Sequence, residues 1–169
     1  IVLLHGFELH QRATHRHSFA VGVRKLQRSH WAMMCGHIGL AVTVIGIAMV
    51  QNYSIEKDVR LAPGEHIEMN GYQFYFAGVR DTDGPNYDGY TADFDITLDG
   101  KAINTLHAEK RFYETAGSMM TEAAIDRGFT RDLYIAMGER LDDNRSWAVR
   151  IYYKPFVRWI WAGSLFMAL

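Results

Sequence analysis

The chain has 169 residues and carries 18 Lys and Arg against 19 Asp and Glu, so its net charge of −1 excludes a broadly basic nucleic-acid binder. Hydrophobic residues make up 49% of the chain and aromatic residues 13%, which excludes a disordered protein. The single cysteine, Cys35, excludes an intramolecular disulfide framework and a structural zinc site built on cysteines.

The first thirty residues predict the edge of a membrane segment followed by a basic loop. Residues 1–4 are apolar and start without an initiator Met, and we interpret them as the end of a truncated transmembrane helix. Residues 5–30 carry five Lys or Arg and one acidic residue, Glu8. Short loops with such a basic excess stay in the cytoplasm, so this segment is predicted to be a basic cytoplasmic loop.

Residues 31–50 form an unbroken apolar stretch with the sequence WAMMCGHIGLAVTVIGIAMV. The stretch contains no Asp, Glu, Lys or Arg, and its 20 residues are enough to cross a hydrocarbon core roughly 30 Å thick. The alternative is a buried helix of a soluble protein. We interpret the stretch as a transmembrane helix, because so long an uncharged run is rare in a globule of 169 residues.

The remaining chain consists of an acidic segment and a second apolar one. Residues 51–152 hold 18 acidic and 11 basic side chains, a net charge of −7, and are therefore predicted to lie on the periplasmic side. Residues 154–169 start with Lys154 and Arg158 and then become apolar. Long cations reach the membrane interface from such positions, so we interpret this segment as the start of a truncated transmembrane helix.

Turn and alternation signals predict a small all-β domain over residues 51–153. Asn70-Gly71 and Asp99-Gly100 each separate two strand-like runs, which is a strong hairpin signal. Residues 117–126 favour a short helix. The expected fold class is thus integral membrane α-helical segments flanking a small all-β periplasmic domain, either a barrel or a sandwich. The expected strands cover residues 65–69, 72–80, 90–98, 101–112, 132–137 and 147–153.

His37 is the residue of the apolar stretch that points to chemistry. It lies roughly 9 Å along the predicted helix from Trp31, at about 1.5 Å per residue. Ionisable side chains at such depth are costly and usually functional, and a neutral imidazole is a common ligand of iron. Helical spacing puts Ala41 and Ala48 on the same face, where they leave room for a flat cofactor. A hydrogen bond from His37 to a neighbouring helix explains the residue equally well.

Other candidate positions predict packing or surface roles. Gly39, Thr43 and Gly46 lie on the face opposite His37 and allow close packing on another helix. His66 and His107 fall in expected strands, where a surface position is the simplest interpretation. No serine nucleophile elbow or glycine-rich phosphate loop is present in the sequence, which argues against a soluble enzyme.

Three segments carry a resemblance to a known family. Residues 36–65, GHIGLAVTVIGIAMVQNYSIEKDVRLAPGE, resemble the later part of the cytochrome c maturation protein F (CcmF) family, multi-pass inner-membrane subunits of the bacterial haem lyase. Residues 128–138, GFTRDLYIAMG, and 150–164, RIYYKPFVRWIWAGS, agree with the family in its order. The resemblance covers essentially the whole chain and makes it the C-terminal portion of a longer protein. The paralogous subunit for cytochrome c nitrite reductase assembly fits the same segments.

The resemblance implies that the chain belongs to the subunit that helps attach haem covalently to apocytochrome c in the periplasm. Implied partners are the other haem lyase subunits that present apocytochrome c, a haem chaperone, apocytochrome c itself, the lipid bilayer and, as a candidate electron donor, quinol. The family holds a haem b between two transmembrane histidines, and His37 matches the second of them in a Gly-His-x-Gly setting. The other ligand and the tryptophan-rich haem-handling segment fall outside this sequence. The fragment alone is therefore not expected to be catalytic.

Two other functions stay open from the sequence. One is a structural assembly scaffold without a haem of its own, and the haem content of the protein distinguishes it from the first interpretation. The other is a quinol-oxidising respiratory haem protein, which predicts quinol oxidation without a defect in cytochrome maturation.

Overall fold

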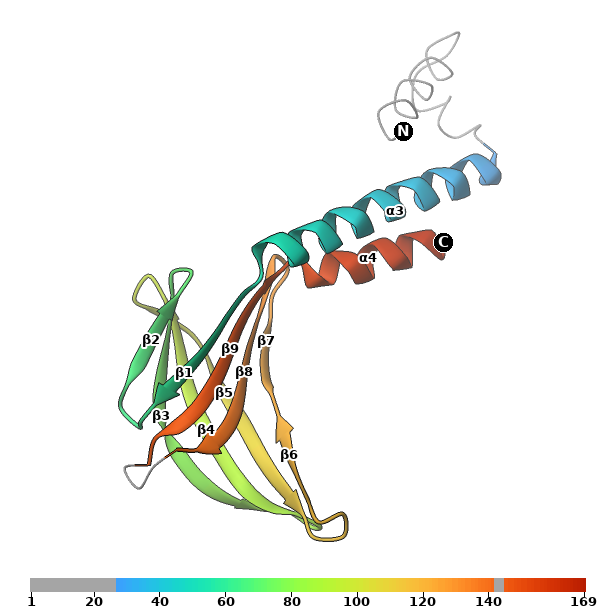
Figure 1. The fold of residues 1–169 in the computed structure, drawn as a ribbon. Coiled ribbons are helices and arrows are strands. Elements are labelled where there is room, and N and C mark those ends of the chain that lie inside the picture. Colours follow the sequence, from blue (N-terminus) through green and yellow to red (C-terminus); the bar gives the residue numbers. More distant parts are fainter. Residues whose placement is uncertain (1–26, 142–144) are drawn as a thin grey trace. The chain divides into compact units, whose positions relative to one another are not determined.

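The structure is a computed structural model that describes residues 27–141 and 145–169 (Figure 1). The predicted membrane segment at residues 1–4 and nearly all of the predicted loop at 5–30 lie outside the described residues. The chain divides into a helical unit, residues 1–52 with 156–169, and a second unit, residues 53–155.

The helical unit contains α3 (Arg28–Tyr53) and α4 (Val157–Met167). Helix α3 has 26 residues, which corresponds to about 39 Å at 1.5 Å per residue. It extends beyond the predicted span of 31–50 at both ends. By length and composition, with a mean hydropathy of 2.0 over its most apolar 18 residues, it is able to cross a membrane.

The second unit is a β-sandwich, one of the two folds expected from the sequence. Its described residues form nine strands in two antiparallel sheets, one with the order β1-β9-β8-β7 and one with the order β2-β3-β4-β5-β6. Figure 1 shows the four strands of the first sheet, sheet A, lying side by side. Sheet A consists of β1 (Ile55–Leu61), β7 (Ala124–Arg127), β8 (Arg131–Arg140) and β9 (Trp147–Pro155). Sheet B consists of β2 (His66–Met69), β3 (Tyr72–Asp83), β4 (Asp88–Leu98), β5 (Lys101–Tyr113) and β6 (Ser118–Glu122).

The core lies between the two sheets, because alternate side chains of each strand face inward. Phe76 and Phe94 are fully buried and stack with ring centroids 4.8 Å apart. Polar side chains also link the sheets. The Lys110 Nζ of β5 donates to the carbonyl oxygen of Gly138 at 3.0 Å, and the Arg131 Nε of β8 donates to the Tyr72 hydroxyl at 2.9 Å.

Both predicted hairpin turns are confirmed. Asn70 and Gly71 join β2 to β3, and Asp99 and Gly100 join β4 to β5. All four residues have positive φ angles, between 50° and 81°. The type I′ turn needs this backbone conformation at both central positions, which Asn-Gly and Asp-Gly supply at little cost.

The short helix predicted at residues 117–126 is wrong, since the segment forms β6 and β7. Its Met, Glu and Ala residues favour a helix locally, but pairing overrides this preference. Strand β6 pairs with β5, with Phe112 opposite Met119, and β7 pairs with β8. Strand β1 was not among the expected strands.

We predict that Phe94→Ala lowers the free energy of unfolding of the sandwich by about 3–5 kcal/mol, because it removes a fully buried ring and leaves a cavity. Tyr75→Ala is the matched control, since Tyr75 lies on the neighbouring strand but is 40% exposed. Thermal unfolding of the purified protein, followed by circular dichroism, measures both. Equal shifts in Tm for the two variants contradict this assignment of the core.

Candidate functional site

Helices α3 and α4 pack through backbone surfaces. A Cβ atom added to Gly39 would lie 2.5 Å from the carbonyl oxygen of Gly163, and one added to Gly163 would lie 2.2 Å from the Thr43 hydroxyl. At Gly46 the nearest atom, from Ile160, would be 2.9 Å away. The expectation that the face with Gly39, Thr43 and Gly46 packs on another helix is therefore confirmed.

His37 lies on the other face of α3. At 3.6 residues per turn, the His37 side chain points away from the direction of Gly39 and Gly46, which contact α4. Its neighbours on that face are small or exposed: Ala41 and Ala48 are alanines, and Val44 is 55% exposed. The helix thus separates a face that binds α4 from a face that presents an imidazole.

The hydrogen bond of His37 determines its tautomer. The Nδ1 atom lies 2.9 Å from the carbonyl oxygen of Met33, one turn earlier in the helix. A carbonyl oxygen only accepts, so Nδ1 carries the proton and donates it. The lone pair then resides on Nε2. Histidines that bind metals commonly use this arrangement, in which a backbone carbonyl orients the ring and the second nitrogen binds the metal.

The Nε2 atom of His37 is suited to be an axial ligand of haem. A single imidazole beside alanines is suited to a flat group that brings its own four equatorial nitrogens, and it is insufficient for a bare metal ion. In residues 27–141 and 145–169, no group of three or more His, Cys, Asp or Glu side chains is placed to hold such an ion. Cys35 is half-buried and is the free thiol of the chain.

His66 and His107 lie at the exposed surface of sheet B, as expected from their positions. His107 Nδ1 is 2.6 Å from the Asp93 carboxylate, which also lies 3.4 Å from Arg80. Arg80, Asp93 and His107 thus form a polar network at the surface, whereas His66 borders a separate hollow with Gly64 and Glu65.

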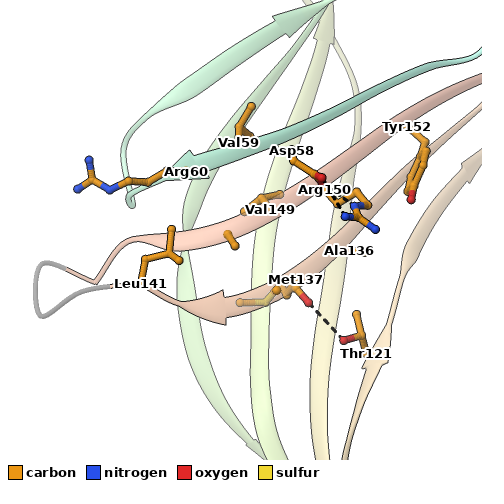
Figure 2. A pocket seen from close by; sticks show the side chains of 12 residues that line it. Asp58, Val59, Arg60, Thr121, Ala136, Met137, Leu141, Val149, Arg150 and Tyr152 are labelled. Atoms are coloured by element: carbon orange, nitrogen blue, oxygen red, sulfur yellow. Dashed lines mark hydrogen bonds and ion pairs between the residues drawn. The ribbon is translucent and has the colours of Figure 1, made fainter.

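The outer face of sheet A contains a hollow of about 670 Å³ (Figure 2). Its floor consists of the small residues Ala136, Gly138 and Ala148 on β8 and β9. Thr121 of β6 lies on one side, and its hydroxyl donates to the carbonyl oxygen of Met137 at 3.3 Å. The hollow exists because three neighbouring outward positions lack long side chains.

Two charged side chains next to this hollow, Asp58 and Arg150, neutralise each other in an ion pair. Arg150 donates to both carboxylate oxygens of Asp58, at 2.6 and 2.8 Å, and lies 3.3 Å from Glu56. The hydrogen bond from Arg150 lowers the pKa of the Asp58 carboxyl, and the same bond raises the pKa of Arg150. Asp58 is therefore ionised and already bound at neutral pH, which is unsuited to a general base.

Sequence reasoning identified His37 but not the hollow. The signal for the hollow was present in Ala136, Gly138 and Ala148, which occupy outward positions in or next to the expected strands 132–137 and 147–153. Their proximity depends on the pairing of β8 with β9, in which Ala136 lies opposite Arg150. Composition alone does not give this register.

Comparison with known proteins identifies the family. A family model described as the CcmF C-terminal beta-sandwich matches residues 52–155. The chain belongs to the CcmF family. It is 60% identical over 169 residues to the cytochrome c-type biogenesis protein CcmF of Haemophilus influenzae, covering 100% of the chain and 26% of that relative. It is 59% identical over 141 residues to CcmF of Escherichia coli, covering 83% of the chain and 22% of that relative.

The paralogue is less similar. The cytochrome c-type biogenesis protein NrfE of Haemophilus influenzae is 36% identical over 145 residues, which cover 86% of the chain and 23% of that protein. A solved structure described as cytochrome c haem lyase CcmF matches with a TM-score of 0.73 at 19% identity, covering 99% of the chain and 28% of that structure. This likeness supports the fold. The chain spans about a quarter of the length of the curated relatives it matches.

We predict that Gly39→Leu destabilises the helical unit by about 1–3 kcal/mol, because the new side chain collides with the backbone of Gly163. Gly36→Leu is the matched control, since a Cβ added at Gly36 meets no atom within 4 Å. The Tm of the full-length protein in detergent, followed by tryptophan fluorescence, measures the difference. If both variants unfold at the same temperature, the glycine contact between the helices is wrong.

Proposed function

We propose that this chain is the part of a haem lyase subunit in which α3 provides one axial ligand of an intramembrane haem b. The observation that carries the proposal is the His37 side chain. Its Nδ1–H is bound to Met33, which leaves Nε2 as the donor atom, and it lies on the face of an apolar helix opposite the α4 contact. The second axial ligand would come from a part of the protein outside this fragment.

His37 acts through its position in this proposal. The carbonyl of Met33 orients the ring, and Ala41 and Ala48 leave space beside it. The packing of α4 on the opposite face holds the helix that carries it. A haem b held there would supply one-electron redox chemistry. We propose that quinol donates the electrons and that these serve the covalent attachment of haem to apocytochrome c.

The expected outcome for His37→Ala in the full-length protein is loss of the haem b absorbance and a lower yield of cytochrome c. Exogenous imidazole should partly restore both, because it replaces the missing ligand. His66→Ala, which removes an exposed histidine of β2, is the matched control and should keep both. Reduced-minus-oxidised visible spectra of the purified proteins measure the haem.

A normal haem b signal in His37→Ala overturns the ligand assignment and favours a structural scaffold. Loss of haem b with normal cytochrome c maturation, together with loss of quinol oxidation, favours a respiratory haem protein. The spectrum and the cytochrome yield therefore distinguish the three functions that the sequence left open.

We further propose that the β-sandwich is the periplasmic docking domain for a partner, either another haem lyase subunit that presents apocytochrome c or apocytochrome c itself. The charge of residues 51–152, with 18 acidic and 11 basic side chains, favours a basic partner surface. Among the described residues, several exposed carboxylates without a salt bridge lie on the strands of sheet B, at Glu68, Asp81, Asp83, Asp88 and Glu122.

Excision of the sandwich tests the docking role. Ile55 and Tyr153 are direct partners in the β1–β9 pair, so their Cα atoms are about 5 Å apart and residues 56–152 can be replaced by two glycines. We expect this variant to keep haem b but to lose co-purification with the partner subunits. Retention of the partners at wild-type levels contradicts the docking role, whereas loss of haem b shows that the excision has disturbed the helices.

A further inference from the structure

The turn between β7 and β8 exposes a large aromatic side chain. Phe129 is 72% exposed, and it is flanked in the turn by Gly128 and Thr130. A phenylalanine in a turn is unusual, because turns favour Gly, Asn, Asp, Pro and Ser. Exposed aromatic side chains are favoured at a membrane–water interface, where the apolar ring leaves water.

The turn lies at the end of sheet A where the chain enters and leaves the sandwich. Arg131, two residues after Phe129, pairs with Pro155, the last residue of β9. The adjacent pair of β1 and β9 begins with Ile55 opposite Tyr153. Only Ser54 connects α3 to β1, and only Phe156 connects β9 to α4. One residue spans at most about 3.6 Å, so this end of the sheet is tethered to the ends of both helices.

The turn is held rigidly, so the exposure of Phe129 is built into the fold. The Gly128 N–H donates to the carbonyl oxygen of Arg131 at 2.8 Å and lies 3.1 Å from the Asp132 carboxylate. A Cβ at Gly128 would lie 2.6 Å from that carbonyl, which makes glycine necessary there. Arg131 in turn pairs with Asp126 and donates to the Tyr72 hydroxyl at 2.9 Å.

The side chains next to the turn suit a lipid headgroup region. Lys154 Nζ lies 4.9 Å from the centre of the Tyr152 ring and 5.4 Å from that of Tyr134. Arg127 is exposed directly before the turn. Tyrosines and long cations favour the membrane–water interface, where their apolar parts are buried and their polar ends stay hydrated. Exposed acidic residues lie at the opposite end of the sandwich, where Asp83 is opposite Asp88 in the register of β3 and β4.

We propose that the β7–β8 turn is a membrane anchor that buries Phe129 at the boundary between headgroups and acyl chains, while Arg127 and Lys154 lie at the level of the phosphates. This proposal rests on the proposed membrane insertion of α3. A bilayer fits better than a protein partner, because a single aromatic tip is far smaller than a stable protein interface. The nearby turns Asn70-Gly71 and Asp99-Gly100 are polar and suit a hydrated headgroup layer.

Site-directed spin labelling of the full-length protein tests the anchor. The protein, with its native cysteines replaced by serine, is reconstituted in vesicles of phosphatidylethanolamine and phosphatidylglycerol, and a nitroxide is attached at Phe129→Cys. Thr115→Cys, in an exposed turn at the opposite end of the sandwich, is the matched control. Leu40→Cys, on α3, reports the membrane insertion on which the proposal rests.

At each position, the accessibility of the nitroxide to oxygen, which partitions into lipid, is compared with its accessibility to a water-soluble nickel chelate. We expect the ratio of oxygen to nickel accessibility at position 129 to exceed that at position 115 several-fold, and position 40 to be shielded from nickel. Ready access of nickel to position 129 overturns the anchor, and so does shielding from both reagents, which would indicate a protein partner. If position 40 is also accessible to nickel, the insertion of α3 fails together with the anchor.

Discussion

The pairing of β1 with β9 is the constraint on which the rest of the sandwich depends. Strand β1 enters sheet A alone, the next five strands form sheet B, and only β9 at the end of the domain gives β1 a partner. The pair brings Ile55 next to Tyr153, so that the chain enters and leaves the domain at neighbouring positions. A domain with adjacent ends can be inserted between two helices without separating them. The same pair also aligns Asp58 with Arg150, whose bidentate ion pair neutralises both groups.

The helical unit depends on a different principle, the division of one helix into two faces. One face of α3 carries the small residues Gly39, Thr43 and Gly46, so α4 can approach the backbone of α3 closely. His37 retains a functional side chain on the other face, and it satisfies one nitrogen within its own helix through Met33. An apolar helix therefore carries a polar group at a reduced cost, because the imidazole Nδ1–H is hydrogen-bonded within the helix itself.

The parts of the structure that the sequence predicted correctly are those encoded locally. The turns Asn70-Gly71 and Asp99-Gly100 fix the backbone geometry of their hairpins, and the spacing of Gly39, Thr43 and Gly46 fixes one helix face. The missed parts are encoded by contacts between distant residues. Strand β1 contains three consecutive charged residues, Glu56-Lys57-Asp58, so its sequence lacks the alternation of apolar and polar residues that indicates a strand. The side chain of Lys57 instead donates to the Glu68 carbonyl of β2 at 3.0 Å, a contact between distant parts of the chain. Residues 117–126 have helix-forming side chains, and only their pairing with β5 and β8 makes them strands.

The distribution of charge over the sandwich separates its two ends. The hollow on sheet A contributes little net charge, because Arg150 already binds Asp58 and lies close to Glu56. At the end tethered to the helices, Asp126 is paired with Arg131, and Asp132 accepts a hydrogen bond in the turn. The β3–β4 hairpin exposes Asp83 and Asp88 at the opposite end of the sandwich, whereas Asp99 is the exposed carboxylate of a turn near the tethered end. If the β7–β8 turn binds the bilayer as proposed, the opposite end, with Asp83 and Asp88, is the face that the proposed basic partner can approach.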